Sequence, residues 1–357
     1  MEFVACPLVV RTQKLELPPY TLLSELVTEA NMTTHKTILI TGASGLVGES
    51  LCATLMARGY SVRILSRSGR GDYQWDVAAG QLDPHVLDGV DAVIHLAGES
   101  VAQRWTDAVK ARILDSRVDS TRLLVDSILA QDKRPTYIAA SGISYYGIDS
   151  ERLLDESSGS GKGFLAEVTR QWEGAAQSLI EVGVRTVFLR TGIVLSARGG
   201  ALAKMLTPFK LGVGGRIGHG QQKMSWISLP DLVSAYVFAV ENVSVQGAVN
   251  AVAPEPVTNS KFTKTLGKVL GRPTVFPLPA SLVKMLFGEM GRETVLSNLA
   301  VLPKSLTELG FEWQQAELEI ALKQTTFLIL GSRYHNSHAS YRRSYYWSRN
   351  FWSPLRD

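Results

Sequence analysis

The sequence has little cysteine, no long hydrophobic run and no metal-binding pattern. Cys6 and Cys52 are the two cysteines of 357 residues. They are too few for a disulfide framework, so we expect a reducing compartment, the cytoplasm. Because no apolar stretch approaches the roughly 20 residues that span a bilayer, we expect no membrane partner. The six histidines are scattered and lack cysteine or acidic partners at metal-binding spacing, so no metal is expected.

Excess positive charge is confined to the end of the chain. The formal net charge is +4, and residues 327–357 hold five arginines against the single acid Asp357, so residues 1–326 sum to zero. The body of the protein therefore gives no reason to expect nucleic acid. Basic and aromatic residues alternate in this tail, a pattern suited to single-stranded nucleic acid. We favour an unstructured tail instead, because helical and strand periodicity end near Leu322.

A glycine-rich segment follows the first predicted strand. Residues 35–41 form a short apolar run typical of a strand buried on both faces, and Gly42, Gly45 and Gly48 follow it. We expect Gly42 to form a tight turn, Gly45 to let the backbone approach a pyrophosphate, and Gly48 to let the next helix pack closely. Amide groups at that helix's N-terminus would face the phosphates. A second strand at residues 61–65 completes a β-α-β unit, which favours a dinucleotide site over a plain glycine turn.

The end of the second predicted strand indicates which dinucleotide binds. An acid there would accept hydrogen bonds from the ribose 2′-hydroxyl of NAD, but residues 65–70 contain none. Arg67 can pair with a 2′-phosphate and stack on adenine, and Ser66 can donate a hydrogen bond. The alternative is a solvated arginine. We favour the phosphate interpretation, so NADP is the predicted cofactor.

Several later segments resemble one protein family. They are residues 91–99, 104–107, 115–122, 140–147, 189–195, 224–232 and 249–259. Over roughly residues 36 to 325 the chain closely resembles the atypical NADP-dependent epimerase-like family. This is a branch of the short-chain dehydrogenase/reductases within the NAD-dependent epimerase/dehydratase superfamily. The resemblance implies an α/β fold, a Rossmann-type doubly wound parallel sheet with a small C-terminal substrate-binding subdomain.

The resemblance also divides the chain and names its cofactor contacts. We expect an extension without regular structure at residues 1–34, an NADP-binding Rossmann core at 35–195, a C-terminal substrate lobe with returning core elements at 196–326, and the basic, aromatic tail at 327–357. The predicted cofactor contacts are Gly42, Ser44, Gly45, Leu46, Val47, Gly48, Ser66, Arg67, Leu96, Ala97, Gly98, Arg112, Arg117 and Val194.

The catalytic pair of ordinary short-chain dehydrogenases is missing from this chain. Those enzymes use a Tyr-x-x-x-Lys pair, in which the tyrosinate moves a proton and the lysine lowers its pKa. The corresponding helix has Phe164 and Val168 at these two places, and moving the alignment by one residue gives Leu165 and Thr169. None of these side chains can do the acid–base work that hydride exchange with an alcohol requires.

Three nearby hydroxyl groups are the candidate catalytic residues. Ser141 stands where the family's substrate-polarising serine lies, and a serine that caps a strand end is the alternative. Tyr145 and Tyr146 are the nearest phenols, and aromatic packing is the role that we favour for each. Glu167 is either a substitute acid or an exposed charge on a helix.

The later part of the sequence resembles a substrate lobe. Residues 212–220 are rich in glycine, which suits either a flap over a ligand or tight hairpin turns. Lys204, Arg216 and Trp226 would suit an anionic or sugar-like ligand if they converge. Asp231 is expected to cap a helix and to act as a structural anchor.

These observations support two hypotheses of function. In the first, the protein is an NADP(H)-dependent oxidoreductase or epimerase with a small polar, sugar-like substrate. The cofactor exchanges a hydride with a carbinol carbon, Ser141 polarises the oxygen, and Tyr145, Tyr146 or an ordered water supplies the proton. In the second, which the missing pair favours, the protein is a non-catalytic NADP-binding sensor or docking protein.

Overall fold

Short apolar runs along the first half of the chain form the strands of a central sheet. The computed structural model describes residues 36–335, and its main sheet has eight strands in the order β12-β8-β6-β5-β1-β2-β3-β4. These strands are β1 (Thr37–Thr41), β2 (Ser61–Ser66), β3 (Tyr73–Asp76), β4 (Gln81–Leu82), β5 (Ala92–His95), β6 (Thr136–Gly142), β8 (Thr186–Thr191) and β12 (Gly247–Ala251).

The sheet is doubly wound about β1. Every neighbouring pair from β12 to β3 is parallel, and only β3 and β4 pair in the antiparallel sense. Ile38, Leu39 and Ile40 are fully buried because helices cover both faces of the sheet. The strand order reverses between β1 and β5, which is where ligands bind in such sheets. The predicted Rossmann-type fold is confirmed.

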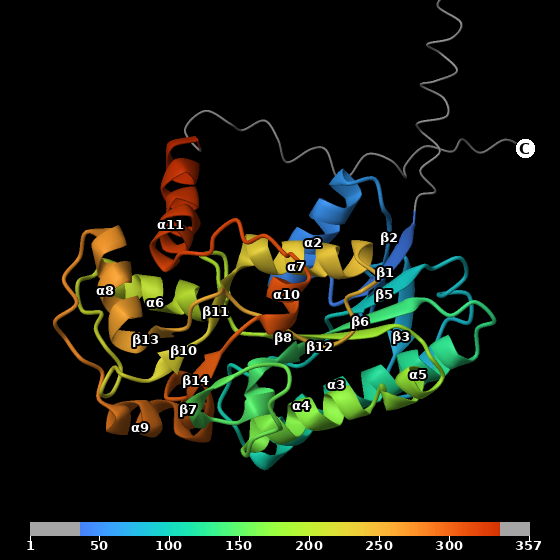
Figure 1. Ribbon diagram of the computed structural model, residues 1–357, viewed down its shortest axis with the longest axis horizontal. Helices are drawn as coiled ribbons and strands as arrows, with labels where there is room; N and C mark the ends of the chain where they lie inside the picture. The colour runs from blue at the N-terminus through green and yellow to red at the C-terminus, as the bar shows by residue number, and fades with distance from the viewer. Residues whose placement is uncertain (1–35, 336–357) are drawn as a thin grey trace, which may run out of the picture. The chain divides into compact units, whose positions relative to one another are not determined.

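Helices cover the two faces of the sheet (Figure 1). One face carries α2 (Leu46–Ala57) and α7 (Leu229–Glu241), and the other carries α3 (Asp107–Leu129), α4 (Phe164–Gly174) and α5 (Gln177–Glu181). Leu51, Leu55 and Tyr236 pack in the core of the first face, and Leu124 and Ile128 pack in that of the second.

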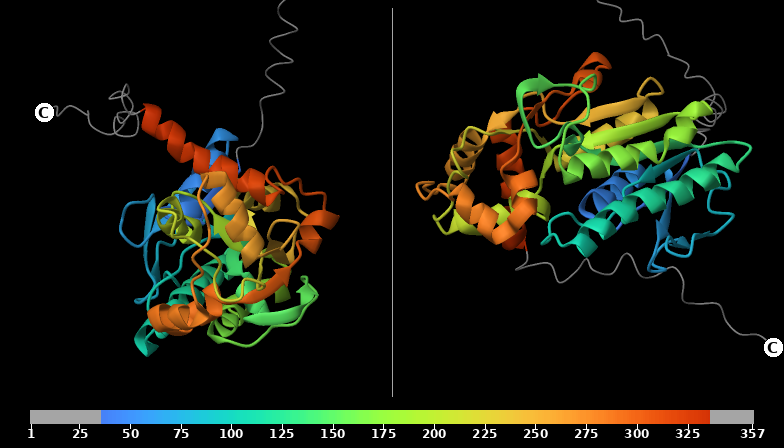
Figure 2. Two further views of the ribbon diagram at one scale, coloured as in Figure 1. Left: turned by 90° about the vertical axis from the view of Figure 1, so that its left-hand side faces the viewer. Right: turned by 90° about the horizontal axis from the view of Figure 1, so that it is seen from below.

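The remaining elements form a lobe beside the sheet (Figure 2). Its helices are α6 (Gly200–Lys210), α8 (Asn259–Leu270), α9 (Ala280–Met290) and α11 (Leu318–His335), and α10 (Lys304–Glu308) leads back to the sheet. Its strands pair as β9 (Ile193–Leu195) with β11 (Trp226–Ser228), β10 (Lys223–Met224) with β13 (Val257–Thr258), and β7 (Asp149–Leu154) with β14 (Asn298–Val301). Trp226 and Phe262 are buried in the core of this lobe.

Two details of the lobe differ from the sequence analysis. The N-cap of α7 is Ser228, whose side chain accepts a hydrogen bond from the Asp231 amide. Asp231 acts as the predicted anchor in another way, because its carboxylate oxygens accept from the amides of Gln314 and Gln315 at 2.8 and 3.1 Å. The expectation that regular structure ends near Leu322 is wrong, because α11 continues to His335.

The continuation of α11 follows from packing at its start. Leu318, Ala321 and Leu322 are buried against the lobe, and each further residue of a helix adds one backbone hydrogen bond. The predicted extension at residues 1–34 and the end of the tail, residues 336–357, lie outside the described residues.

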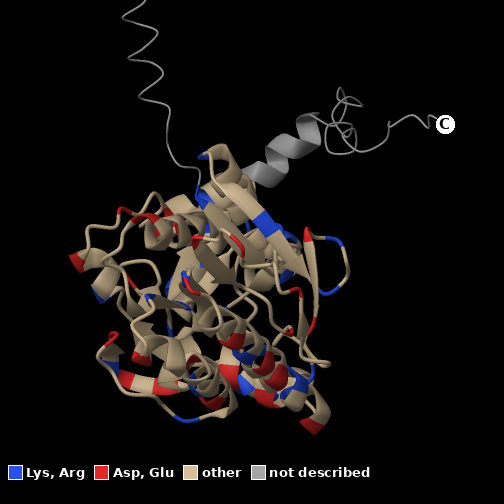
Figure 3. Cartoon of the chain, turned by 90° about the vertical axis from the view of Figure 1, so that its right-hand side faces the viewer, with Lys and Arg blue, Asp and Glu red and all other residues tan. Residues whose placement is uncertain are grey.

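Charged residues on the described part of the chain are interspersed by sign (Figure 3). Exposed ion pairs such as Arg58–Glu241 and Lys268–Glu319 join elements that are distant in sequence, at 3.0 and 2.8 Å. This distribution accords with the zero net charge of residues 1–326.

Candidate functional site

The turn after β1 requires glycine at two positions. Gly42 has a φ of 71°, and a Cβ atom there would lie 2.8 Å from the Ala97 amide nitrogen. At Gly48, a Cβ would lie 2.3 Å from the Gly42 carbonyl oxygen. The turn, the loop after β5 and the start of α2 therefore approach one another at backbone distance, as the sequence analysis expects for Gly42 and Gly48.

The N-terminus of α2 lacks a protein cap. Its N-cap is Gly45, which offers no side-chain acceptor, whereas the caps of α3, α7 and α8 are the side chains of Thr106, Ser228 and Thr258. Ser44 and Gly45 are exposed. The first amide groups of a helix need acceptors, and a phosphate supplies them. This helix end therefore fits the diphosphate of a dinucleotide.

Arg67 lies at the end of β2 with a free side chain. It is exposed, and within residues 36–326 its guanidinium makes no hydrogen bond or ion pair. Gln74 Nε2 donates to the Arg67 carbonyl oxygen at 3.2 Å, and Ser66 Oγ lies 3.0 Å from Ser68 Oγ. The backbone at this strand end is thus held while the guanidinium stays available for a 2′-phosphate.

A buried histidine supports the loop after β5. Thr41 Oγ1 accepts hydrogen bonds from the amides of Leu96 and Ala97, both at 3.2 Å, and lies 2.7 Å from His95 Nδ1. His95 Nε2 lies 3.0 Å from Ser120 Oγ, which itself donates to a helix carbonyl. The Nε2–H tautomer of neutral His95 satisfies all of these contacts, with Thr41 donating to Nδ1. This chain of hydrogen bonds fixes Leu96 and Ala97, two of the predicted cofactor contacts.

Protonation of His95 is expected to make the fold sensitive to acid. Burial, and then the charge of Arg117, lower the pKa of His95 from 6.5 to about 3. Between these two values the unfolded chain binds a proton that the folded protein does not, so the free energy of unfolding rises with pH and levels off above pH 6.5. Urea unfolding at several pH values across this range should show that the free energy of unfolding rises less steeply with pH in His95→Gln than in the wild type. His85→Gln changes a side chain that is 77% exposed and should keep the wild-type slope. Equal slopes for the wild type and His95→Gln would contradict the assignment.

Three other predicted cofactor contacts differ in their surroundings. Arg117 Nη1 donates to the carbonyl oxygens of Glu99 and Ile113 at 3.0 and 2.9 Å, so Arg117 shapes the turn at Gly98. Burial lowers the pKa of Arg117 to about 10, which leaves it charged at neutral pH. Arg112 is exposed on α3, and Val194 is half-buried on β9.

Ser141 lies at the end of β6 and is engaged by a buried ion pair. Its Oγ donates to Glu173 Oε1 at 2.6 Å. Glu173, on α4, accepts two hydrogen bonds from the Arg190 guanidinium at 2.8 and 2.6 Å. The side chains of Arg190 and Glu173 are only 5% and 12% exposed. The Ser141 hydroxyl therefore donates its hydrogen bond to a carboxylate, and its oxygen lone pairs remain available to accept one.

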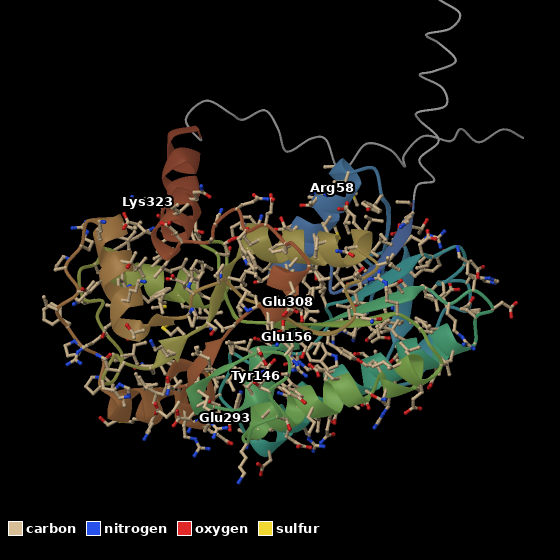
Figure 4. The ribbon with its side chains drawn as sticks, viewed as in Figure 1. Arg58, Tyr146, Glu156, Glu293, Glu308 and Lys323 are labelled. Atoms are coloured by element: carbon tan, nitrogen blue, oxygen red, sulfur yellow. The ribbon has the colours of Figure 1, made fainter. Side chains whose placement is uncertain are left out.

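The two tyrosines, of which Tyr146 is labelled in Figure 4, contact Arg190 in different ways. Tyr146 is buried, and its hydroxyl donates to Asn250 Oδ1 at 2.8 Å and accepts from Arg190 Nη1 at 3.1 Å. Burial raises the pKa of Tyr146 above its usual value. Tyr145 lies with its ring under the Arg190 guanidinium, 3.4 Å from the ring centroid, and its hydroxyl makes no hydrogen bond within residues 36–326. The two rings pack edge-on against each other at a centroid distance of 5.4 Å, as we favoured for both, and Tyr145 keeps a free phenol.

The positions of the missing pair are filled by apolar contacts. Phe164 packs edge-on against Trp105 at a centroid distance of 4.9 Å, and Lys110 Nζ lies 4.9 Å from its ring centroid. Val168 is buried. Glu293, a buried residue of the lobe, accepts hydrogen bonds from the backbone amide of Phe164 at 2.9 Å. Neither Phe164 nor Val168 presents a hydroxyl or amine in place of the Tyr–Lys pair, and the Lys110 amine beside Phe164 is paired with Glu289 at 2.6 Å.

Several open alternatives are decided by the structure. Glu167 is an exposed helix charge, because it binds Arg170 and Gln171 on the outer surface of α4. Lys204 and Trp226 do not converge on a ligand, because Trp226 is 1% exposed inside the lobe while Lys204 is exposed on α6. In the glycine-rich loop at residues 212–220, Gly215 and Ile217 form isolated β-bridges with a neighbouring segment, which hold the loop in place.

Sequence reasoning did not find Glu173, Arg190 and Asn250 as partners of the candidate catalytic residues. One signal was available in the sequence. Arg190 is a charged residue within a buried strand, and a buried charge needs a counter-ion. Which carboxylate is the counter-ion depends on how α4 packs against β8, and neighbouring residues in the sequence do not determine that packing.

The described residues contain no group of three or more His, Cys, Asp or Glu side chains that could hold a metal ion. No helix among them is long and apolar enough to cross a membrane.

The doubly wound sheet, with an uncapped glycine turn at its switch point, defines a dinucleotide-binding fold of the Rossmann type. Residues 38–252 match the NAD dependent epimerase/dehydratase family, and residues 278–325 match a domain of unknown function, DUF1731. The chain belongs to the NAD dependent epimerase/dehydratase family.

Three similar proteins indicate its place in that family. The epimerase family protein Mb2239 of Mycobacterium bovis is 40% identical over 293 residues, 81% of this chain and 97% of that protein. The crystal structure of human epimerase family protein SDR39U1 (isoform 2) with NADPH is 34% identical, with a TM-score of 0.74, over 82% of this chain and 99% of that one. The nucleoside-diphosphate sugar epimerase of Corynebacterium glutamicum is 29% identical, with a TM-score of 0.66, over 89% of this chain and 72% of that one.

Proposed function

We propose that this protein is an NADP(H)-dependent oxidoreductase or epimerase that acts on a small polar, sugar-like substrate. The observation that carries the proposal is the free guanidinium of Arg67 after β2, at the end of the strand next to β1, which leads into the uncapped N-terminus of α2. Arg67 can hold a 2′-phosphate, the group that distinguishes NADP from NAD, and the helix end can hold the diphosphate that both share. A structure of the human relative contains NADPH, and a relative from Corynebacterium glutamicum is named for sugar nucleotides.

The chain's own residues would hold this cofactor along three loops. The amides of Leu46 and Val47 would bind the diphosphate, Ser66 and Arg67 the 2′-phosphate, and the loop at Ala97 would lie beside the ribose. A bound nicotinamide would exchange a hydride with a carbinol carbon of the substrate. Everything else in the reaction is proton transfer, and the protein must supply it.

Ser141 and Glu173 would carry that proton. Because Ser141 Oγ already donates to Glu173, it can accept the hydrogen bond of a substrate hydroxyl. As that hydroxyl loses its proton to Ser141, the Ser141 proton moves to Glu173, and the reverse transfer protonates the oxygen of a reduced carbonyl. Arg190 holds the Glu173 carboxylate in position through two hydrogen bonds. The free hydroxyl of Tyr145 is the second group that would carry a proton.

The second candidate function is a non-catalytic NADP(H) sensor or docking protein. Phe164 and Val168 stand in place of the Tyr–Lys pair, and the carboxylate behind Ser141 already accepts two hydrogen bonds from Arg190. Both observations favour a cleft that binds the dinucleotide without using it.

Single-turnover oxidation of bound NADPH separates the two candidates. The protein is loaded with NADPH, and loss of nicotinamide absorbance is followed with a panel of sugar-like aldehydes and ketones. We expect at least one compound to speed oxidation, and Ser141→Ala to slow it while NADPH still binds. If NADPH binds and no compound accelerates its oxidation, the sensor function replaces the enzyme. If NADPH does not bind, both candidates fail.

Two further proposals concern the partners of the protein and its compartment. We propose a small-molecule substrate, with neither nucleic acid nor membrane as a partner, and a cytoplasmic location. Cys52 is a free, buried thiol, and burial raises its pKa to about 11, so it is unreactive. Cys52 therefore serves as an apolar residue of the core.

A further inference from the structure

We infer that the lobe carries a second ligand site, for a small anionic and hydroxyl-rich molecule of the sugar-phosphate class. The site is a cavity of about 600 Å³ between the β7–β14 ribbon, α9 and the loop before β10. These elements lie together at the lower left of Figure 1. None of the predicted catalytic or cofactor residues lines the cavity.

The β7–β14 ribbon separates this cavity from the candidate catalytic residues. Successive side chains of a strand point to opposite faces. On β14, Leu299 and Val301 pack in a cluster with Tyr146, whereas Asn298 and Ala300 line the cavity. The cavity is therefore on the far side of the ribbon from Tyr146, and a ligand in it would not contact a substrate at Ser141.

Three cationic side chains face the cavity without strong partners. Lys223 and Lys284 make no ion pair within residues 36–326. Arg292 is 3.9 Å from Glu293, but that carboxylate is already bound by the amides of α4. Cations that line one cavity and form no close ion pair attract an anion, and a phosphate or carboxylate group would satisfy them.

Two other side chains that line the same cavity are suited to hydroxyl groups. Asp149 and Glu151 line the cavity, and carboxylates accept hydrogen bonds from hydroxyls but repel a bare anion. The site therefore favours one molecule that carries both an anionic group and hydroxyls.

Calorimetric titration of the full chain with glucose 6-phosphate, glucose and inorganic phosphate tests the inference. The protein is first saturated with NADPH, so that the phosphate-binding parts of the cofactor cleft are filled. We expect glucose 6-phosphate to bind at least about tenfold more tightly than either glucose or phosphate, since only it can contact both the cations and the carboxylates. Lack of measurable binding, or equal affinity for all three, would overturn the inference.

Matched charge reversals locate the site. Lys284→Glu lies on the cavity wall and should weaken glucose 6-phosphate binding at least about tenfold, as should Lys223→Glu. Lys264→Glu changes an exposed lysine on α8 that does not line the cavity, and should leave the affinity unchanged. Equal loss in all three variants, or displacement of the sugar phosphate by excess NADPH, would refute this location. Because this test needs no turnover, it stands whether or not the proposed enzymatic activity is found.

Discussion

Glu173→Ala is expected to lower the free energy of unfolding by about 3–5 kcal/mol, because it leaves a buried guanidinium without its counter-ion. Burial by itself lowers the pKa of Arg190, but the hydrogen bonds and the charge of Glu173 raise it above its usual value. A guanidinium does not lose its proton at neutral pH in proteins, so Arg190 stays charged when Glu173 is removed. The two side chains are 5% and 12% exposed, so water would compensate little of the loss. Urea unfolding at neutral pH measures the change.

The control for this prediction is an exposed ion pair in the same molecule. Arg58 Nη1 lies 3.0 Å from Glu241 Oε1, and the two side chains are 50% and 42% exposed. Glu241→Ala should cost no more than about 1 kcal/mol, since water replaces the partner of Arg58. If Glu173→Ala and Glu241→Ala cost the same, the buried pair does not stabilise the fold as described. Glu173→Gln keeps hydrogen-bonding capacity and should fall between the two.

Arg67→Asp is expected to weaken NADPH binding about 100-fold, or ~2.7 kcal/mol, and to leave NADH binding unchanged or improved. The substitution removes the group that would pair with the 2′-phosphate and adds a carboxylate that repels it. The same carboxylate can accept hydrogen bonds from the ribose 2′-hydroxyl of NADH. Because Arg67 is exposed and makes no side-chain contact within residues 36–326, the fold should be unaffected. Fluorescence titration of the two dinucleotides gives both affinities.

A second exposed arginine separates this effect from one of overall charge. Arg122 is 66% exposed on α3 and pairs only with Asp119, at 3.7 Å, among the described residues. Arg122→Asp should change the two affinities by less than about twofold. An unchanged preference for NADPH in Arg67→Asp would rule out this residue as the 2′-phosphate ligand. A parallel loss of NADPH and NADH binding would instead indicate damage to the whole cleft.

The parts of the protein that the sequence by itself determined are those set by neighbouring residues. The apolar run before Gly42 and the spacing of Gly42, Gly45 and Gly48 predict the first β-α-β unit, since strand burial, turn conformation and close helix packing act within a few residues. The loss of the Tyr–Lys pair is equally local, because a phenylalanine or a valine cannot move a proton in any fold. The identity of the residues that contact cofactor or substrate stays a prediction.

Tertiary structure alone decided which side chains meet. Ser141 and Glu173 are 32 positions apart, and Tyr146 and Asn250 are 104 apart, yet both pairs are hydrogen-bonded. Such contacts depend on the order of strands in the sheet and on how α4 packs against them. The hydrophobic periodicity of the sequence predicts neither the strand order nor this packing. The continuation of α11 and the burial of Trp226 are similar cases. A side chain's role depends on partners that arrive from distant segments, and only packing specifies those partners.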